Sequence, residues 1–176
     1  MSYEDYVQSE ILEPNGLAAT SFPLDVAQHL AEPRIPGMMY LPAGAIDIDQ
    51  YNMSFEFAQG NLVTNAADLL SWLRKWQTGT AGLDLSTVLQ MRESVNPDQN
   101  YGLGTSFSPG FGYGHTGAIA GYITLMFYDP DTDFAFVLLS NMWNMKSEAS
   151  FNDHAYTLFD IAAKAKQLIT ADNPDT

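Results

Sequence analysis

The chain has 176 residues, 46% of them hydrophobic, which is enough for one sizeable core or two smaller cooperating cores and argues against a disordered chain. Its 21 acidic residues outnumber 7 basic ones, and the net charge of −14 opposes binding to nucleic acid or to anionic membrane surfaces. The chain has no cysteine, which excludes disulfides and thiolate chemistry and leaves the compartment open.

The first third of the chain predicts one helix and a long irregular connection. Ser2 can cap a helix over residues 3–12, and Pro14-Asn15-Gly16 stops it. Residues 17–59 contain four prolines and have no steady periodicity, so we expect a long irregular connection with a short strand near residues 38–41.

Two further helices are expected before residue 96. Thr64 can cap an amphipathic helix in which Trp72 and Trp76 stand four residues apart, and we interpret both tryptophans as core residues rather than as a stacking platform. Asp84 can cap a second, shorter helix.

From residue 100 onward the pattern changes to strands. We predict four of them, joined by glycine-rich or aspartate-rich turns, at residues 101–107, 112–118, 121–128 and 134–140. The short connections imply antiparallel pairing. Residues 129–133 begin like a calcium loop but lack its later glycine and glutamate, so we interpret them as a hairpin turn. Residues 151–169 complete the chain as a helix.

These elements predict an α+β fold: an antiparallel sheet with a C-terminal helix packed on it, preceded by a helical and irregular N-terminal half. We expect a division into two parts. Residues 1–96 would hold the helices and the long connection, and residues 97–176 would hold the strands and the last helix.

One run on the second predicted strand combines residue types that carry chemistry. It reads Tyr113-Gly114-His115-Thr116-Gly117-Ala118. A hydrogen-bonding side chain, a hydroxyl and a glycine in sequence suit a strand whose backbone must come close to a substrate carbonyl. The alternative is a histidine that is merely hydrogen-bonded beside a tight strand.

The run resembles the third active-site motif of the serine β-lactamase and penicillin-binding protein superfamily, in the His-Thr-Gly form of class C-like β-lactamases and DD-peptidases. The resemblance extends from about residue 2 to about residue 168. It also includes residues 3–16, the segment Gly60-Asn61-Leu62-Val63-Thr64-Asn65-Ala66-Ala67-Asp68-Leu69, and Tyr101-Gly102-Leu103-Gly104.

Two motifs of that superfamily are missing from these 176 residues. No lysine has a serine three positions before it, so there is no Ser-x-x-Lys, and no tyrosine begins a Tyr-x-Asn. The Ser-x-Asn match Ser94-Val95-Asn96 lies too close to the His-Thr-Gly run to be the second motif, and we interpret it as a helix end.

The resemblance implies that the His-Thr-Gly strand forms one wall of an active-site cleft. His115 would assist proton movement or orient hydroxyls, and Thr116 would bind a substrate carboxylate or carbonyl. Gly117 would leave room for substrate, and the backbone N–H of Ala118 would be one of two oxyanion-hole donors.

The expected function is therefore that of a C-terminal part of a serine hydrolase that acts on a β-lactam, D-alanyl peptide, ester or amide, inactive by itself because the nucleophile is missing. The alternative is a non-catalytic binding or scaffold module derived from this family. The three histidines are too dispersed for a metal site, and we expect no metal or cofactor.

The expected partners are a small-molecule or peptide substrate in the full-length parent and either a second copy of the chain or an N-terminal half. Residues 134–140 would pair with a strand of that half in the family fold, and would otherwise form an exposed edge that favours self-association. No apolar run reaches the length of a membrane span, and residues 1–20 do not have the pattern of a signal peptide.

Overall fold

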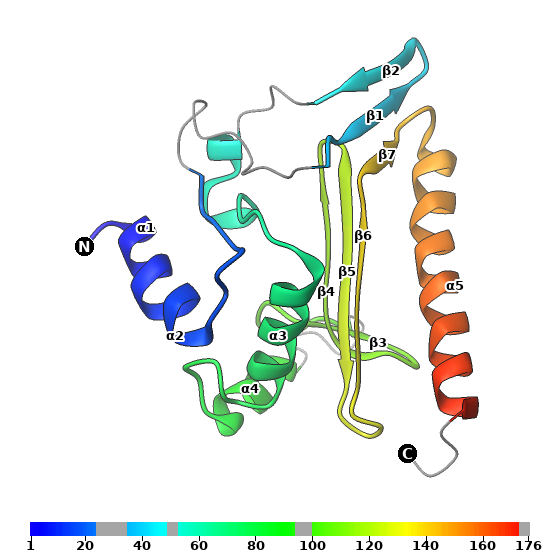
Figure 1. The fold of residues 1–176 in the computed structure, drawn as a ribbon. Helices are drawn as coiled ribbons and strands as arrows, with labels where there is room; N and C mark the ends of the chain where they lie inside the picture. The colour runs from blue at the N-terminus through cyan, green and yellow to red at the C-terminus, as the bar shows by residue number, and fades with distance from the viewer. Residues whose placement is uncertain (24–34, 49–52, 94–99, 173–176) are drawn as a thin grey trace. The chain divides into compact units, whose positions relative to one another are not determined.

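The computed structural model describes residues 1–23, 35–48, 53–93 and 100–172 (Figure 1). The run Ser94-Val95-Asn96 lies outside these ranges. By its internal contacts the chain forms two compact units that interleave along the sequence. The first contains Met1–Glu32, Asn52–His115 and Met126–Val137, and the second contains Pro33–Tyr51, Thr116–Leu125 and Leu138–Thr176. A boundary near residue 96 stays a prediction about the subdomains of the family fold.

The predicted first helix is present and has three consecutive parts: α1 (Tyr3–Tyr6), the π-helical η1 (Val7–Leu12) and α2 (Glu13–Asn15). Ser2 caps it as predicted. Its hydroxyl accepts a hydrogen bond from the backbone N–H of Asp5 at 3.1 Å, and the Asp5 carboxylate accepts one from the N–H of Ser2 at 3.1 Å. These bonds favour the charged carboxylate and lower the pKa of Asp5. Gly16 ends the segment in the left-handed conformation, with φ of 69°.

Helix α3 (Ala66–Gln77) confirms the predicted amphipathic helix, but its cap is Asn65 and not Thr64. The side chain of Asn65 accepts a hydrogen bond from the N–H of Asp68 at 2.9 Å. The Thr64 hydroxyl instead makes a tertiary contact and lies 2.8 Å from the hydroxyl of Thr20.

The short helix α4 (Leu85–Arg92) begins at its predicted cap, Asp84, whose carboxylate accepts a hydrogen bond from the N–H of Thr87 at 2.8 Å. That bond lowers the pKa of Asp84. The 3₁₀ segment η2 (Met53–Gln59) lies in the region expected to be irregular.

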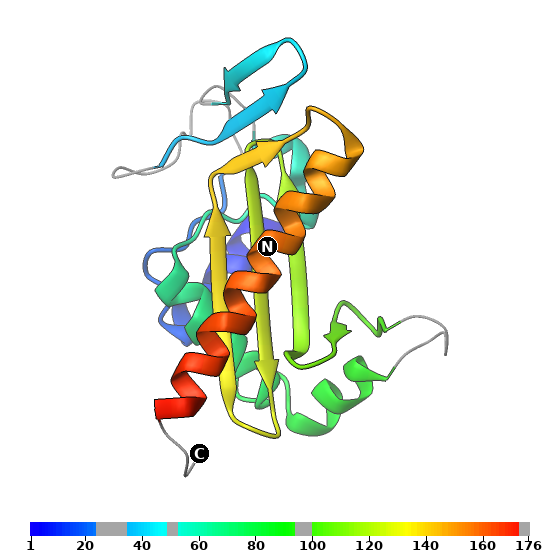
Figure 2. The ribbon, with the colours of Figure 1, turned by 90° about the vertical axis from the view of Figure 1, so that its right-hand side faces the viewer.

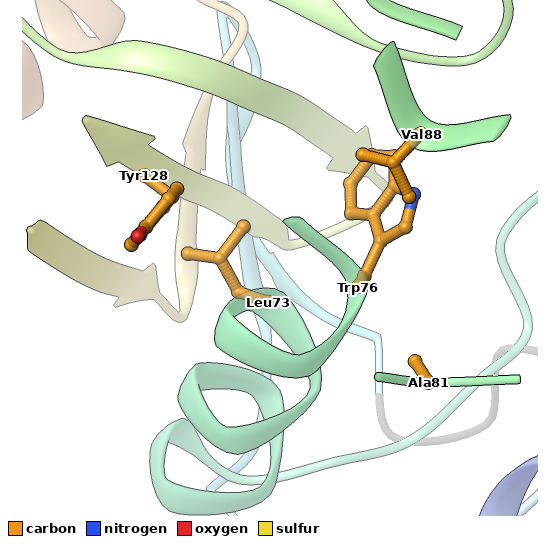
Figure 3. Close-up of a cluster of buried hydrophobic side chains, with 5 residues drawn as sticks. All are labelled: Leu73, Trp76, Ala81, Val88 and Tyr128. Atoms are coloured by element: carbon orange, nitrogen blue, oxygen red, sulfur yellow. The ribbon is translucent and has the colours of Figure 1, made fainter. Parts of the chain in front are cut away.

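The main core of the first unit lies between α3, α4 and strand β5 (Tyr122–Asp129). Figure 3 shows its buried members: Leu73, Trp76, Ala81, Val88 and Tyr128. Trp72 packs against this cluster and also against a second one, formed by Val7, Leu12, Leu17 and Phe22. The interpretation of both tryptophans as core residues is confirmed.

A four-stranded sheet has the order β3-β4-β5-β6, with β3 (Ser106–Ser108), β4 (Gly112–Ile119) and β6 (Phe134–Ser140). The last three strands match their predicted positions within one residue at each end. The predicted strand at residues 101–107 is wrong over most of its length. Residues 101–105 form a tight loop instead, in which the N–H of Gly102 donates to the carbonyl of Thr105 at 2.8 Å and Gly104 has a φ of 71°.

The turn between β5 and β6 confirms the hairpin interpretation of residues 129–133. The carboxylate of Asp129 accepts hydrogen bonds from the N–H of Asp131 at 3.1 Å and from the hydroxyl of Thr132 at 2.8 Å. Arg74 of α3 holds the end of the turn, since it donates to the carboxylate of Asp133 at 2.6 Å and to its carbonyl at 3.0 Å.

The second unit contains a three-stranded sheet that sequence patterns did not predict in full. Its order is β2-β1-β7, with β1 (Met38–Leu41), β2 (Gly44–Asp47) and β7 (Met142–Asn144). Only β1 was expected. It pairs antiparallel with β2 and parallel with β7, with Met38 opposite Met142.

Helix α5 (Glu148–Asp172) follows β7 and is longer than predicted at both ends (Figure 2). Its first turns contact the strands that precede it: the ring of Phe151 lies 5.9 Å from that of Trp143, and His154 lies 3.3 Å from the hydroxyl of Ser140. The antiparallel strands and this C-terminal helix confirm the α+β class. Within the four described ranges, no helix is both long and apolar enough to cross a membrane.

Candidate active site

Strand β4 carries all four predicted site residues in succession. His115 is half-buried and belongs to the first unit, whereas Thr116, Gly117 and Ala118 are exposed and belong to the second. The exposed stretch therefore begins directly after the histidine. A wall that touches substrate needs such an accessible stretch of backbone.

The glycines of β4 differ in what surrounds them. A Cβ at Gly114 would overlap the carbonyl of Met126, so the close approach of β5 requires glycine at that position. A Cβ at Gly117 would meet only the side chain of Thr124, at an ordinary 3.7 Å, and its φ lies outside the range that favours glycine. Neither packing nor backbone conformation explains why residue 117 is glycine.

The backbone just before His115 is held by two hydroxyls. Thr105, only 1% exposed, donates to the carbonyl of Gly114 at 3.3 Å, and Ser106 donates to the same oxygen at 3.2 Å. Because one carbonyl accepts both bonds, the peptide that precedes the histidine is fixed from the side of β3.

Pairing of β3 with β4 stops at Gly114. The register joins Ser108 to Gly112 and Ser106 to Gly114, and β3 reaches no further along β4. The N–H of Phe107 donates to the carbonyl of Asn100 at 2.8 Å, away from β4. Because backbone groups alternate in direction along a strand, Ser106 and Ser108, on either side of Phe107, direct theirs toward β4.

This pattern sets the direction of the backbone groups farther along β4. The backbone N–H and C=O of one residue in a strand point to the same side, and the side alternates from residue to residue. Gly114 directs its carbonyl toward β3. By the same alternation the N–H of Ala118 faces that edge, past the last residue that β3 covers.

His115 has a specific side-chain partner. The hydroxyl of Tyr101 lies 2.9 Å from Nε2 of the imidazole, and the two rings meet edge to face with their centroids 5.6 Å apart. The sequence reading used Tyr101 only as part of the Tyr-Gly-Leu-Gly segment and missed this contact. In the sequence, the sign that could have indicated this contact was a tyrosine, Tyr101, 14 positions before His115.

A half-buried cation supports the strand two residues before the histidine. The guanidinium of Arg92 lies 4.6 Å from the ring centroid of Tyr113 and donates to the side-chain and backbone oxygens of Gln77 at 3.1 and 2.8 Å. Burial lowers the pKa of Arg92 and raises that of Tyr128, since both environments disfavour charge.

The profile of the family described as Beta-lactamase matches residues 1–160, and the chain belongs to that family. A comparison with curated protein sequences gives no match.

Solved structures extend this likeness. A D-stereospecific amidohydrolase from Streptomyces sp. is 25% identical, with a TM-score of 0.69, and the match covers 81% of this chain and 44% of that one. D-amino acid amidase from Ochrobactrum anthropi SV3, complexed with L-phenylalanine amide, is 22% identical with a TM-score of 0.70, covering 93% and 52%. FmtA from Staphylococcus aureus is 19% identical with a TM-score of 0.61, covering 80% and 38%. The chain thus spans about half the length of the first two structures or less.

Proposed function

We propose that this chain forms the C-terminal part of a serine hydrolase of the β-lactamase and DD-peptidase type. Its substrates would be β-lactams, D-alanyl peptides, esters or amides. Among these, the similarity to the D-stereospecific amidohydrolase favours an amide with a D-configured acyl part.

The observation that carries the proposal is the direction of the Ala118 N–H, on an exposed edge of β4 next to a glycine that packing does not require. Negative charge develops on the carbonyl oxygen of an acyl group when a nucleophile adds to it. A fixed backbone donor stabilises that charge in the transition state, and loss of one such donor costs about 10²- to 10³-fold in rate.

Each residue of the run has a distinct part in this proposal. Ala118 supplies the N–H of one oxyanion-hole donor, and Thr116 offers a hydroxyl to a carboxylate or carbonyl of the substrate. Gly117 leaves the strand open, so that the substrate backbone can lie against it. His115 orients the hydroxyl groups around the reacting acyl carbon.

The reaction needs a nucleophilic serine, and these 176 residues contain no Ser-x-x-Lys motif to provide one. The serine oxygen bonds to the acyl carbon and gives its proton to a base, while the amine leaves with a proton. Water then breaks the acyl–serine ester and releases the acid. We propose that a segment with Ser-x-x-Lys and Tyr-x-Asn supplies the serine and its base.

The first prediction follows from the proposal that the serine and its base lie on another segment. The 176-residue chain alone should form no covalent adduct with a penicillin or with a serine-directed phosphonate, because no serine here stands three residues before a lysine as the Ser-x-x-Lys motif requires. Intact-mass spectrometry after incubation measures the adduct. A stoichiometric adduct on any serine of this chain would contradict the proposal.

In a second experiment, in which activity is expected, the chain is joined to a family segment that carries Ser-x-x-Lys and Tyr-x-Asn. The joined polypeptide should acquire the adduct on the serine of that motif and hydrolyse a D-amino acid amide. A joined polypeptide that folds and binds substrate without acylation would favour the non-catalytic module instead.

A further inference from the structure

We propose that Tyr101 is a positioning residue for His115: its phenol donates to Nε2 of the imidazole and holds the ring in one orientation and in the Nδ1–H tautomer. The effect of Tyr101 on the reaction rate rests on the proposed function, whereas its effect on the tautomer of His115 does not.

Two contacts of different kinds join these side chains. The phenol oxygen lies 2.9 Å from Nε2, within the range of a good hydrogen bond. The ring planes meet at 76°, with centroids 5.6 Å apart, which is the preferred edge-to-face arrangement. A hydrogen bond fixes the position of one ring nitrogen, and the ring contact restricts rotation of the imidazole around that bond.

The loop that carries Tyr101 is held at several points along its backbone. The N–H of Leu103 donates to the carbonyl of Met91 at 2.8 Å, and the N–H of Gly102 donates to that of Thr105 at 2.8 Å. A Cβ at Gly102 would overlap the carbonyl of Met91, so the loop lies directly against the end of α4. Tyr101 itself forms a bridge with Ser106. Its phenol is therefore presented from a fixed backbone.

The last residue of this loop and the first residue of β3 also hold the histidine. The hydroxyls of Thr105 and Ser106 both bind the carbonyl of Gly114, the residue before His115. One short segment thus fixes both the backbone and the side chain of the histidine. This double attachment is what a group that must keep one orientation requires.

The chemistry of the two groups decides which one donates. A neutral imidazole nitrogen is a much more basic acceptor than a phenol oxygen, and the phenol carries a good O–H donor. Nε2 therefore accepts, and the imidazole proton resides on Nδ1. The tautomer of a histidine is set by the hydrogen bond that its other nitrogen makes, so removal of the phenol should release it.

The test is the tautomer of His115 in the full chain, read from two-bond nitrogen–proton correlation spectra at about pH 8, where an ordinary imidazole is neutral. The wild-type chain should show the Nδ1–H form. Tyr101→Phe keeps the aromatic ring and should shift His115 toward the Nε2–H form.

Tyr113→Phe is the matched control, since it removes a phenol oxygen from β4 itself without removing the partner of His115. It should leave the tautomer unchanged. An Nε2–H form in the wild type, or an unchanged tautomer in Tyr101→Phe, would overturn the proposal.

Kinetics of the joined, active polypeptide give a second readout. Tyr101→Phe should lower kcat roughly 5- to 10-fold with little change in KM, the typical effect of one lost hydrogen bond. Added to His115→Ala, it should cost less than about 2-fold more, because both changes remove the same unit. Full additivity would overturn the positioning role. Absence of activity in the joined wild type would count against the proposed function, while the tautomer result would still decide the role of Tyr101.

Discussion

Glycine serves two different purposes along β4. At Gly114 the carbonyl of Met126 occupies the place of a side chain, so the residue is required by packing. At Gly117 the nearest atom to an added Cβ is 3.7 Å away, so a methyl group would fit. The contrast separates a residue that the fold needs from one that the proposed substrate contact needs.

This contrast gives a prediction for the matched pair Gly114→Ala and Gly117→Ala. Gly114→Ala should lower the free energy of unfolding by about 2 kcal/mol or more, since the strand must shift to accept the Cβ. Gly117→Ala should change it by less than about 1 kcal/mol. Urea unfolding monitored by circular dichroism measures both values.

Equal destabilisation by the two alanines would show that Gly117 is a packing residue and would remove one support for the wall. In the joined polypeptide, Gly117→Ala should lower kcat/KM despite its intact fold, because the methyl group projects where substrate is proposed to lie.

At the scale of elements, helix α3 organises the first unit. Leu73 is 0% exposed at the centre of the cluster with Trp76, Val88 and Tyr128 (Figure 3). Arg74, the next residue, holds the turn after β5 through Asp133. One helix thus covers β5 by apolar contact and fixes its turn by hydrogen bonds.

Leu73→Ala should therefore destabilise the chain by about 3 kcal/mol, the usual cost of a cavity in a tightly packed core. Leu89→Ala on α4 is the control, because Leu89 is 48% exposed and its truncation should cost no more than about 0.5 kcal/mol. Denaturant titration compares them. A similar loss in both would mean that the cluster around Leu73 is not the main core.

At the scale of the whole molecule, β6 ends the order of the four-stranded sheet within the described residues. The strand has no charged residue, and Leu139 is 46% exposed. An apolar strand at a sheet edge offers backbone groups to another strand. The net charge of −14 works against association of two copies, and salt screens that repulsion.

We therefore propose that the isolated chain self-associates through β6 and does so more strongly at high salt. Light scattering across a concentration series measures the mass. Leu139→Lys should weaken association by placing charge on the edge strand, whereas Leu168→Lys, at a residue 68% exposed on α5, should not. A monomer at all concentrations and salt levels would contradict this prediction.

Features that depend on neighbours along the chain could be predicted from the sequence. The caps at Ser2 and Asp84, the stop at Gly16 and the turn at residues 129–133 rest on hydrogen bonds or dihedral angles within a few residues. Helices and strands could also be predicted, because apolar residues recur along the sequence with the period of each kind of element. The His-Thr-Gly run was visible for the same reason, since its residues are consecutive.

Features that join distant residues could not be predicted from local sequence patterns. The parallel pairing of β1 with β7 brings Met38 opposite Met142, and no local pattern encodes such a partner. The cap of α3 is Asn65 and not Thr64, whose hydroxyl lies against that of Thr20, 44 positions away. Tyr101 reaches His115 across 14 positions because residues 101–105 fold into a loop where a strand was expected. All three features are contacts between residues far apart in the sequence. Packing of the whole chain determines which backbone segments come together, and local patterns do not encode it.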